Sequence, residues 1–350
     1  MAQSTTTITQ QDVAKHMGVS RAWVARALSG DPRISARSRA RVEEAARQAG
    51  YLPEANRIAR SLAGRRYGHA IRCNVIGCLN LHLTASGDPE EPALFSLGLL
   101  VGVDLAARNH GQEILLTNAS AELRHGRVDG VLAFGAEARS MRKAWYPDLP
   151  FVTVNEPLTD AHFVVGDDYG GTQQAVAHLL QLGHRRIAYL GHAHAESHAI
   201  DRRLQGYQDA LQSAGIAAKP AWTVRFKKDN PSYRESGRCA MRQWLERDWR
   251  KTGCTALLAQ NDHIAMGAIR ALIECGLRVP EDVSVIGFDS TRECDIFNPR
   301  LTSVHLPLAT IGAAAIDLLM REVRGEVQTV QHIVVPTKLD VRDTTAASGL

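Results

Sequence analysis

The spacing of apolar residues near the amino terminus predicts two short helices separated by a tight turn. The first begins after Thr9, whose hydroxyl is suited to cap the free amides of the first turn. It ends at Gly18, because a residue without a Cβ readily adopts the left-handed conformation that closes helices. Ser20 caps the second helix, whose predicted buried stripe is Val24, Ala27 and Leu28. Two short helices joined in this way are typical of a helix-turn-helix.

A third helix is predicted over residues 36–49. Ser35 stands at its amino end as a cap, and Gly50 stops it. Its inward positions are small or apolar: Val42, Ala45, Ala46 and Ala49. The three helices together predict a small all-α head.

Beyond residue 74, short apolar runs alternate with longer helical patterns, which indicates parallel sheets with crossover helices. The predicted strands are 74–79, 113–116, 130–133, 151–155, 186–190, 222–226, 256–259, 283–288 and 333–336. The predicted helices are 94–109, 170–182, 203–214, 233–247, 262–275 and 309–324. The crossover at 117–128 is too short for a full helix, so we expect a trimmed first half.

Charge is distributed unevenly between the head and this body. Residues 1–66 carry twelve Lys/Arg and five Asp/Glu, a balance of +7, and the rest of the chain carries 29 and 32, a balance of −3. A basic head on a slightly acidic body indicates a polyanionic partner for the head. The alternative is that its arginines only form solvated helix faces.

Composition narrows the class of protein further. No run approaches about eighteen consecutive apolar residues, and the first residues lack an apolar export signal. The six cysteines form no Cys-x-x-Cys pair and are interpreted as reduced thiols. We therefore expect a cytoplasmic protein without a membrane segment.

Residues 9–64 resemble a known DNA-binding head. The segment TQQDVAKHMGVSRAWVARALSGDPRISARSRARVEEAARQAGYLPEANRIARSLAG is similar, with little or no gap, to the head of the lactose-repressor (LacI/GalR) family. The resemblance implies that Arg21, Ala22 and Arg26 touch bases in the major groove, where small and basic side chains fit. The full DNA-binding set implied for this chain is Thr9, Ser20, Arg21, Ala22, Trp23, Arg26, Asn56, Ala59 and Leu62.

Two positions depart from the family's pattern. Trp23 and Ala25 replace the family's usual Thr and Ser, which contact phosphates, so two hydroxyl donors are lost. The half-site sequence of the family therefore cannot be transferred to this chain. Two roles stay open for Trp23: packing on the sugar-phosphate edge, or filling the core of the head.

Residues 56–64 resemble the family's hinge helix, which orders only on operator DNA. The resemblance implies that Leu62 opens the central base step of the minor groove, with Ala59 one turn earlier on the same face. Such an apolar wedge costs stacking energy but bends the DNA onto more protein surface. The alternative is a plain linker helix that packs Leu62 against the body.

The body resembles the type I periplasmic-binding-protein fold, which has two lobes built on parallel sheets. The resemblance is carried by FVTVNEP, GHRRIAYLG, RRLQGYQDAL, LLAQNDHIAMGAIRALIECGLRVPEDVSVIGFD and PRLTSVHLPL, and it is weakest over residues 80–145. We expect a head over residues 1–54, a hinge helix and linker over 55–66, and a body over 72–343. The first lobe would comprise about 72–167 and 305–330, and the second about 168–304 and 331–343.

In open α/β sheets, the loops at the carboxyl ends of strands form the ligand site. The resemblance places candidate effector contacts on such loops, with an arginine near the start of a helix and two aromatic residues for stacking. They are Phe95, Asn155, Arg203, Tyr233, Asn261 and Asp289. An aspartate, an arginine and two amides bracket a hydroxylated ligand with paired donors and acceptors, so we expect a sugar or a nucleoside.

Each of the polar candidates also has a purely structural alternative. Asp289 could cap a helix, and Asn261 could serve a turn. Arg203 could bridge Asp201 or Asp262 on the surface. Asn155 stands where the family often has an acidic residue, which leaves its role open.

Three histidines, His192, His194 and His198, raise the question of a metal ion. Their spacing is irregular, so no metal site is expected, and a ligand contact by His194 or His198 stays open. The sequence has no Gly-rich phosphate loop, nucleophile elbow or paired catalytic carboxylates, so neither a cofactor nor an enzyme activity is expected.

The residues and the resemblance together predict a sequence-specific transcriptional regulator, most simply a repressor, that acts as a homodimer on pseudo-palindromic operator DNA. An effector between the lobes would change their closure and the spacing of the hinges, which is a two-state switch. A ligand-binding protein that never touches DNA is one rival, but it leaves the basic head unexplained. An enzyme is the other. The identity of the effector, and whether it releases or promotes operator binding, stay open.

Overall fold

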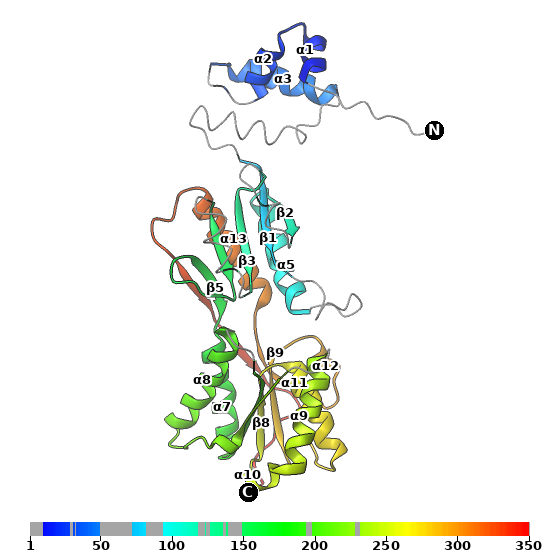
Figure 1. Ribbon diagram of the computed structural model, residues 1–350, viewed down its shortest axis with the longest axis vertical. Coiled ribbons are helices and arrows are strands. Elements are labelled where there is room, and N and C mark those ends of the chain that lie inside the picture. Colours follow the sequence, from blue (N-terminus) through cyan, green and yellow to red (C-terminus); the bar gives the residue numbers. More distant parts are fainter. Residues whose placement is uncertain are drawn as a thin grey trace, which may run out of the picture.

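The computed structural model contains a helical head and two sheets covered by helices (Figure 1). The described residues are 10–28, 31, 33–49, 72–81, 94–117, 123, 127–135, 138, 149–193, 198–227 and 232–349. Several sequence predictions lie outside these ranges: Thr9, Asn56, Ala59, Leu62 and the rest of the segment 55–66, His194, and most of the crossover 117–128.

Three helices form the head: α1 Gln10–Met17, α2 Arg21–Leu28 and α3 Ala36–Gln48. Their apolar faces meet in one small core, composed of Val13, Ala14, Val24, Ala27, Leu28, Val42 and Ala46. The apolar spacing therefore predicted both the helices and the faces that they bury.

The ends of these helices follow the predicted caps. Gly18 has a φ of +67°, the left-handed conformation expected where α1 ends. The Ser20 hydroxyl accepts a hydrogen bond of 3.2 Å from the amide of Trp23 at the start of α2. The Ser35 hydroxyl accepts one of 3.2 Å from the amide of Ser38 at the start of α3. Local side-chain chemistry thus fixes where the helices begin.

The first lobe is built on a six-stranded sheet in the order β11-β5-β4-β3-β1-β2, in which every neighbouring pair is parallel. Its strands are β1 Val75–Leu79, β2 Glu113–Thr117, β3 Gly130–Phe134, β4 Phe151–Val154, β5 His162–Gly166 and β11 His332–Val335. Two helices pack against each other in this lobe, α5 Leu94–Asn109 and α13 Leu308–Val323. They approach closely at Gly102, where a Cβ would lie 1.8 Å from the carbonyl oxygen of Ala309.

The second lobe has a sheet in the order β12-β10-β9-β8-β6-β7, parallel except for the pair β10 and β12. Its strands are β6 Ile187–His192, β7 Thr223–Phe226, β8 Ala256–Ala259, β9 Ser284–Asp289, β10 Thr302–His305 and β12 Lys338–Asp340. Its long helices pack in pairs on the two faces of the sheet (Figure 1): α7 Asp168–Gln181 with α8 His198–Ser213, and α9 Tyr233–Arg247 with α11 Asp262–Glu274. The short elements are the 3-10 turn η4 Pro220–Trp222, α10 Trp249–Thr252 and α12 Glu293–Ile296.

The chain crosses between the lobes three times: after β5, after β10 and after β11. Two crossings are joined by hydrogen bonds, because the Asp167 amide donates to the Val335 carbonyl (2.9 Å) and the Thr337 hydroxyl donates to the Asp167 carbonyl (3.0 Å). In the remaining crossing, the one after β10, the Leu306 amide donates to the carbonyl of Asp289 (3.3 Å). The connection between the lobes therefore borders the carboxyl ends of the second lobe's strands.

The lobe boundary that we predicted at residue 331 is wrong. β11 pairs with β5 of the first sheet, so the chain returns to the second lobe only after Val335. The predicted strand was correctly identified but assigned to the other sheet. A short apolar strand has no local feature that selects its partner, so this choice is made by tertiary packing.

Three strands, β5, β10 and β12, were not predicted. β10 lacks an apolar run because Thr302 and Ser303 are fully buried polar residues. Their hydroxyls are satisfied inside the fold, and that of Ser303 donates to Asp262. Burial of hydrogen-bonded polar residues hides such a strand from a search based on hydrophobicity.

Two predictions about composition can be compared with the structure. All six cysteines are free thiols. Within the described part of the chain, no helix is long and apolar enough to span a membrane.

Candidate nucleic-acid interface and ligand site

The second helix of the head presents a basic face. Arg21, Ala22 and Arg26 are exposed on α2, on the side away from its buried stripe. The Nε atom of Arg26 donates to the carbonyl of Ala22 at 3.3 Å, which lays the side chain along the helix. Two exposed arginines with a small residue between them have the shape and charge to enter a major groove.

Trp23 lies between these exposed residues and the interior. Its side chain is half-buried and packs against the core of the head. Ala25 is also half-buried. This packing favours the core-filling role of Trp23. The exposed part of its ring can still contact the sugar-phosphate backbone of a nucleic acid.

The loop between α2 and α3 is held by an ion pair that the sequence analysis missed. The side chain of Asp31 is 0% exposed and accepts hydrogen bonds from the amide (3.0 Å) and the guanidinium (2.7 Å) of Arg33. The hydrogen bonds from Arg33 lower the pKa of Asp31 to about 2. Because Asp31 follows α2 closely, this pair fixes the exit of the basic helix.

Arg203 is the centre of a buried polar cluster in the second lobe. Its side chain lies on α8 and is 8% exposed. The Nε atom donates to Asp168 Oδ1 (2.7 Å), and the two terminal nitrogens donate to the Gln260 carbonyl (2.7 Å) and to Asp289 Oδ1 (3.1 Å). The guanidinium also lies over the ring of Phe288, 3.7 Å from its centroid. Each of the three guanidinium nitrogens therefore donates at least one hydrogen bond inside the fold.

The cluster is assembled from the ends of several elements. Asp168 begins α7 directly after the first crossing between the lobes, Gln260 follows β8, and Asp289 ends β9. Since the carboxyl ends of parallel strands lie along one edge of a sheet, residues distant in sequence meet here.

Burial and charge oppose each other in this cluster. Burial raises the pKa of Asp289 to about 7, although the nearby Arg203 charge acts in the other direction. Burial likewise raises the pKa of Asp168, again against the effect of Arg203. Burial alone would lower the pKa of Arg203, but the charges of Asp168 and Asp289 outweigh it and raise that pKa. The arginine is thus held charged, and the carboxylates are the groups able to take up a proton.

The structural alternatives for Arg203 and Asp289 are contradicted. The partners of Arg203 are Asp168 and Asp289, not Asp201 or Asp262. α8 begins at His198, so Arg203 lies within the helix and does not open it. Asp289 ends β9 with a φ of +104°, and the cap position of the next helix, α12, is occupied by Arg292.

Asn261 has a structural role of its own. Its side chain caps α11 by accepting a hydrogen bond of 2.9 Å from the amide of Ile264. The next residue, Asp262, is buried and accepts a hydrogen bond of 2.8 Å from the Thr291 amide. The same capping geometry that holds Asn261 also places it at the carboxyl end of β8.

The first lobe contributes two of the predicted contacts. Asn155 follows β4 with a φ of +60°, and its Nδ2 atom is buried without a hydrogen-bond partner among the described residues. A buried amide donor left in this state costs free energy unless a ligand or water accepts from it. Phe95, in the first turn of α5, is half-buried against the main core.

Three rings gather near the carboxyl ends of β6 and β7. The ring of His192 makes edge contacts with Tyr233 (centroids 5.6 Å apart) and with Phe226 (6.0 Å). Tyr233, the predicted stacking residue, begins α9 and is half-buried. His198 begins α8, and burial lowers its pKa. Among the described residues, no three His, Cys, Asp or Glu side chains converge in a way that could hold a metal ion.

Sequence reasoning missed Asp168 and Gln260. A signal for Asp168 was present, since it closely follows the run HFVVG, and the rule about carboxyl ends would have selected it had β5 been predicted as a strand. Gln260 contributes its backbone carbonyl, for which side-chain chemistry gives no signal.

Two family models match this chain. Residues 9–54 match the model described as bacterial regulatory proteins, lacI family. Residues 176–345 match the model described as periplasmic binding protein-like domain. The first range covers the head, and the second covers most of the second lobe together with α13 and β11 of the first lobe.

Curated relatives match over nearly the whole chain. The HTH-type transcriptional regulator CelR of Thermobifida fusca is 31% identical, with 96% of this chain and 97% of that protein covered. The HTH-type transcriptional repressor PurR of Edwardsiella ictaluri (strain 93-146) is 30% identical, with 97% of both chains covered.

Solved structures are similar over the same extent. The lac repressor dimer bound to operator and the anti-inducer ONPF has a TM-score of 0.75 and 26% identity, covering 98% of this chain and 100% of that chain. A complex of the transcriptional regulator CelR with cellobiose has a TM-score of 0.68 and 27% identity, covering 96% of this chain and 99% of that chain. The predicted fold class, a helix-turn-helix head on a two-lobed body with parallel sheets, is confirmed.

Proposed function

This chain belongs to the lacI family of bacterial regulatory proteins and is a DNA-binding transcriptional regulator, and from that premise we propose how its own residues act. The head binds one half-site of an operator, and the body binds a small hydroxylated effector that controls this binding. Repression is the expected mode of action. A regulator of this kind works where the bacterial DNA is, in the cytoplasm.

In the DNA-binding part, Arg21, Ala22 and Arg26 are the proposed base contacts. Their exposure on α2 supports this assignment. Thr9, Ser20 and Trp23 would contact the DNA backbone, and in the segment 55–66 Asn56, Ala59 and Leu62 would contact the minor groove. This division assigns residues 1–54 to the head, as the family match over 9–54 supports.

In the effector site, the proposed contacts are Phe95, Asn155, Arg203, Tyr233, Asn261 and Asp289, to which we add Asp168. The observation that carries the proposal is the buried cluster of Arg203 with Asp168 and Asp289, a charged group that lines the end of a parallel sheet. Hydroxyl groups both donate and accept, so they suit a site with carboxylates, a guanidinium and amides. The CelR relative was solved with cellobiose, which supports a sugar as the first ligand class to test.

The same cluster suggests how a ligand would act on the head. Asp168 follows the first crossing between the lobes, and the backbone of Asp289 is hydrogen-bonded to the crossing after β10. A ligand that binds one arrangement of the lobes better than another would shift the equilibrium between them. A homodimer would carry this shift to two hinges. Exposed apolar side chains are available for its interface: Val101, Leu105, Leu116, Ile273 and Ile296.

The test of the effector site is a thermal-shift panel of sugars and nucleosides on the full chain, with Asp289→Asn as the comparison. A ligand that binds only the native state raises the melting temperature, and the rise grows with the logarithm of its concentration relative to Kd. We expect at least one compound to stabilise the wild type and not Asp289→Asn. The Asp289→Asn protein should still bind DNA in the absence of effector, since Arg203 keeps Asp168. A variant that responds at the same concentration as the wild type would remove Asp289 from the site.

The two rivals are tested separately. A ligand-binding protein without DNA binding would fail to bind any duplex in a mobility-shift assay. An enzyme would convert the stabilising compound, whereas we expect it to be recovered unchanged after incubation with the protein. The curated relatives that match are regulators, which supports the proposed class.

A further inference from the structure

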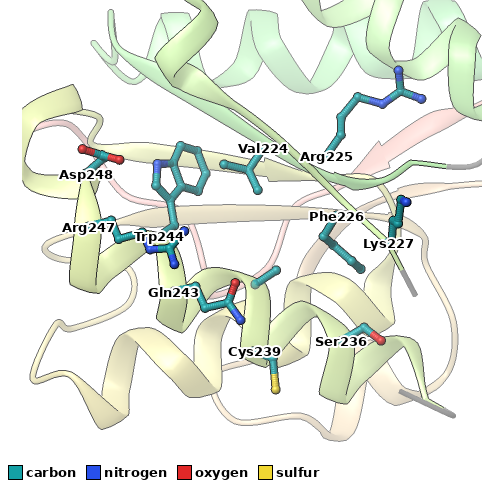
Figure 2. Close-up of a pocket in the computed structure, with 11 residues that line it drawn as sticks. Val224, Arg225, Phe226, Lys227, Ser236, Cys239, Gln243, Trp244, Arg247 and Asp248 are labelled. Atoms are coloured by element: carbon teal, nitrogen blue, oxygen red, sulfur yellow. The ribbon is translucent and has the colours of Figure 1, made fainter. Parts of the chain in front are cut away.

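A pocket lies between β7 and α9, separate from the Arg203 cluster (Figure 2). Its volume is about 600 Å³. The apolar residues of its lining are Val224 and Phe226 from the strand and Ala240 and Trp244 from the helix. Because β7 is the last strand of its sheet, this pocket borders the edge of the sheet.

The outer edge of β7 carries backbone groups available for pairing. The carbonyl of Phe226 accepts a hydrogen bond of 2.7 Å from the Ala193 amide, so the backbone groups of Phe226 face β6. Successive residues of a strand direct their backbone groups to opposite sides, so those of Arg225 face outward. Within the described residues no strand pairs with this side of β7. Such an edge is a template for an added strand.

Three cations line this region without a carboxylate partner among the described residues: Arg225, Lys227 and Arg247. The one acid in the lining, Asp248, pairs with Lys251 at 2.9 Å. The other arginines of α9 all form ion pairs: Arg234 with Glu293, Arg238 with Glu235 and Arg242 with Glu246. Within the described part of the chain, these three cations therefore leave a net positive charge at the rim of the pocket, whereas the other arginines of α9 are paired with carboxylates.

The side chains of β7 alternate in chemistry as well as in direction. Phe226 points toward α9, whereas Arg225 points away from it (Figure 2). By the same alternation, Val224 lies on the side of Phe226 and Lys227 on the side of Arg225. A strand added next to β7 would meet apolar side chains on one face and cations on the other.

We propose that the edge of β7 binds an extended segment of a partner protein in which acidic and apolar residues alternate. The acidic side chains lie beside Arg225 and Lys227, and the apolar ones enter the pocket over Phe226 and Trp244. The backbone pairs with the outward groups of Arg225, which is the mode of recognition by strand addition.

A second copy of this chain is a poor occupant of the same edge. Pairing β7 with another β7 would bring Arg225 and Lys227 of one copy beside those of the other, and like charges across strands are destabilising. A rival explanation is that the cations only protect the edge strand from aggregation. If that were their sole role, the edge would have no affinity for an acidic strand. The charge of the partner is therefore the decisive variable.

The test uses the full chain and a fluorescein-labelled probe, acetyl-Asp-Val-Asp-Phe-Asp-Val-Asp-amide, followed by anisotropy at low salt. We expect saturable binding. The same peptide with Lys in place of Asp, and the acidic peptide with alternate amides N-methylated, should not bind, since one loses the charge match and the other the backbone hydrogen bonds. Equal binding of all three peptides, or binding of none, overturns the proposal.

Charge reversal at the edge gives the matched comparison. The double variant Arg225→Glu with Lys227→Glu should weaken binding of the acidic probe about tenfold or more, because two cross-strand pairs change from attraction to repulsion. The control, Arg72→Glu with Arg321→Glu in the first lobe, makes the same change in net charge at two other exposed arginines and should leave binding unchanged. Circular dichroism and melting temperature check that both variants are folded. A decrease of equal size in both variants would indicate non-specific attraction and would overturn the proposal.

Hydrogen exchange supplies an independent measurement on the wild type. The probe should slow exchange of the Arg225 amide, which faces outward, while the amides of β8 in the middle of the sheet stay unchanged. Protection confined to residues outside β7 and α9 would place the peptide elsewhere and contradict strand addition.

Discussion

The head and the second lobe place arginine in opposite surroundings. Arg21 and Arg26 are exposed on a helix of the small head, where a partner can reach them from solvent. Arg203 is 8% exposed and is bound to two carboxylates and a backbone carbonyl. Residue type alone does not separate recognition of a polyanion from organisation of a ligand site. Burial and partners do, because a buried guanidinium must be neutralised inside the fold whereas an exposed one is solvated.

The two regions also differ in how they are stabilised. The head has a core of seven small or medium-sized side chains, closed by caps and by the Asp31–Arg33 pair. The second lobe shares one large hydrophobic core with part of the first lobe. A change to an exposed arginine in the head should therefore alter binding, and a change to the buried arginine should alter folding.

The largest expected effect is that of Arg203→Met. The substitution leaves Asp168 and Asp289 buried without their counter-charge, which costs about 3–5 kcal/mol of the free energy of unfolding. Urea denaturation followed by tryptophan fluorescence measures this, because Trp222, Trp244 and Trp249 are all buried in the second lobe. The control Arg21→Met should stay within about 0.5 kcal/mol of the wild type. Equal effects in the two variants would contradict the comparison.

Next in size is the effect of Arg26→Ala on DNA binding. An arginine that reads a guanine contributes about 1–3 kcal/mol of discrimination, so affinity for the operator should fall and preference at one symmetric pair of positions should relax. The free energy of unfolding should hardly change. Anisotropy with operator and random duplexes measures both affinities. If the two affinities fall equally, Arg26 contacts only phosphate.

Leu62→Ala tests the link between the two regions. A shorter wedge should reduce DNA bending and lower affinity for the operator about tenfold, since part of the surface gained by bending is lost. Non-specific binding should persist, because it depends mainly on the basic charges. Bend angles and affinities on operator and random duplexes, measured for both proteins, give the answer. Identical bending by wild type and variant would assign Leu62 to the linker or the body instead of the minor groove.

The smallest effects are opposite slopes of stability with pH. Asp31, with a pKa lowered from 3.8 to about 2, stabilises the fold above its unfolded value and loses that contribution as pH falls from about 4 toward 2. Asp289, with a pKa raised from 3.8 to about 7, contributes stability at acidic pH that is lost as pH rises from about 4 through 7. The measurement is the melting temperature from pH 2 to 8 for wild type, Asp31→Asn and Asp289→Asn. Each difference curve should slope in its own direction, and parallel curves would contradict the assigned environments.

Much of the fold was predictable because its signals are local. The extents of α5, α9 and β8 agree with the apolar periodicity at both ends. Ser20, Ser35 and Gly18 act through neighbours within a turn of helix, so their roles could be read from the sequence. β10 could not, because its buried residues Thr302 and Ser303 are polar and its pairing with β9 and β12 joins distant parts of the chain.

The candidate site was only partly predictable, for the same reason. Arg203 and Asp289 were selected by resemblance. The rule that ligand sites form at the carboxyl ends of parallel strands predicted that they lie near the same edge of a sheet. Their direct ion pair and the participation of Asp168 required the relative positions of α7, α8 and β9. Asn261 was assigned as a contact, and its use as the cap of α11 emerged only from the structure.

The sequence by itself determined the class of this protein: a basic helix-turn-helix head, a body with two parallel sheets, and a set of polar residues at strand ends. These features depend on composition and on spacings of a few residues, which local sterics and hydrogen bonding translate directly into helices, caps and strands. Only the tertiary structure decided that β11 joins the first sheet and that Arg203 is buried between Asp168 and Asp289. It also decided that the edge of β7 carries cations, unpaired within the described residues, beside a pocket with Phe226 and Trp244 in its lining. Such pairings join residues far apart in the chain, and their energies depend on burial, which no stretch of sequence carries alone.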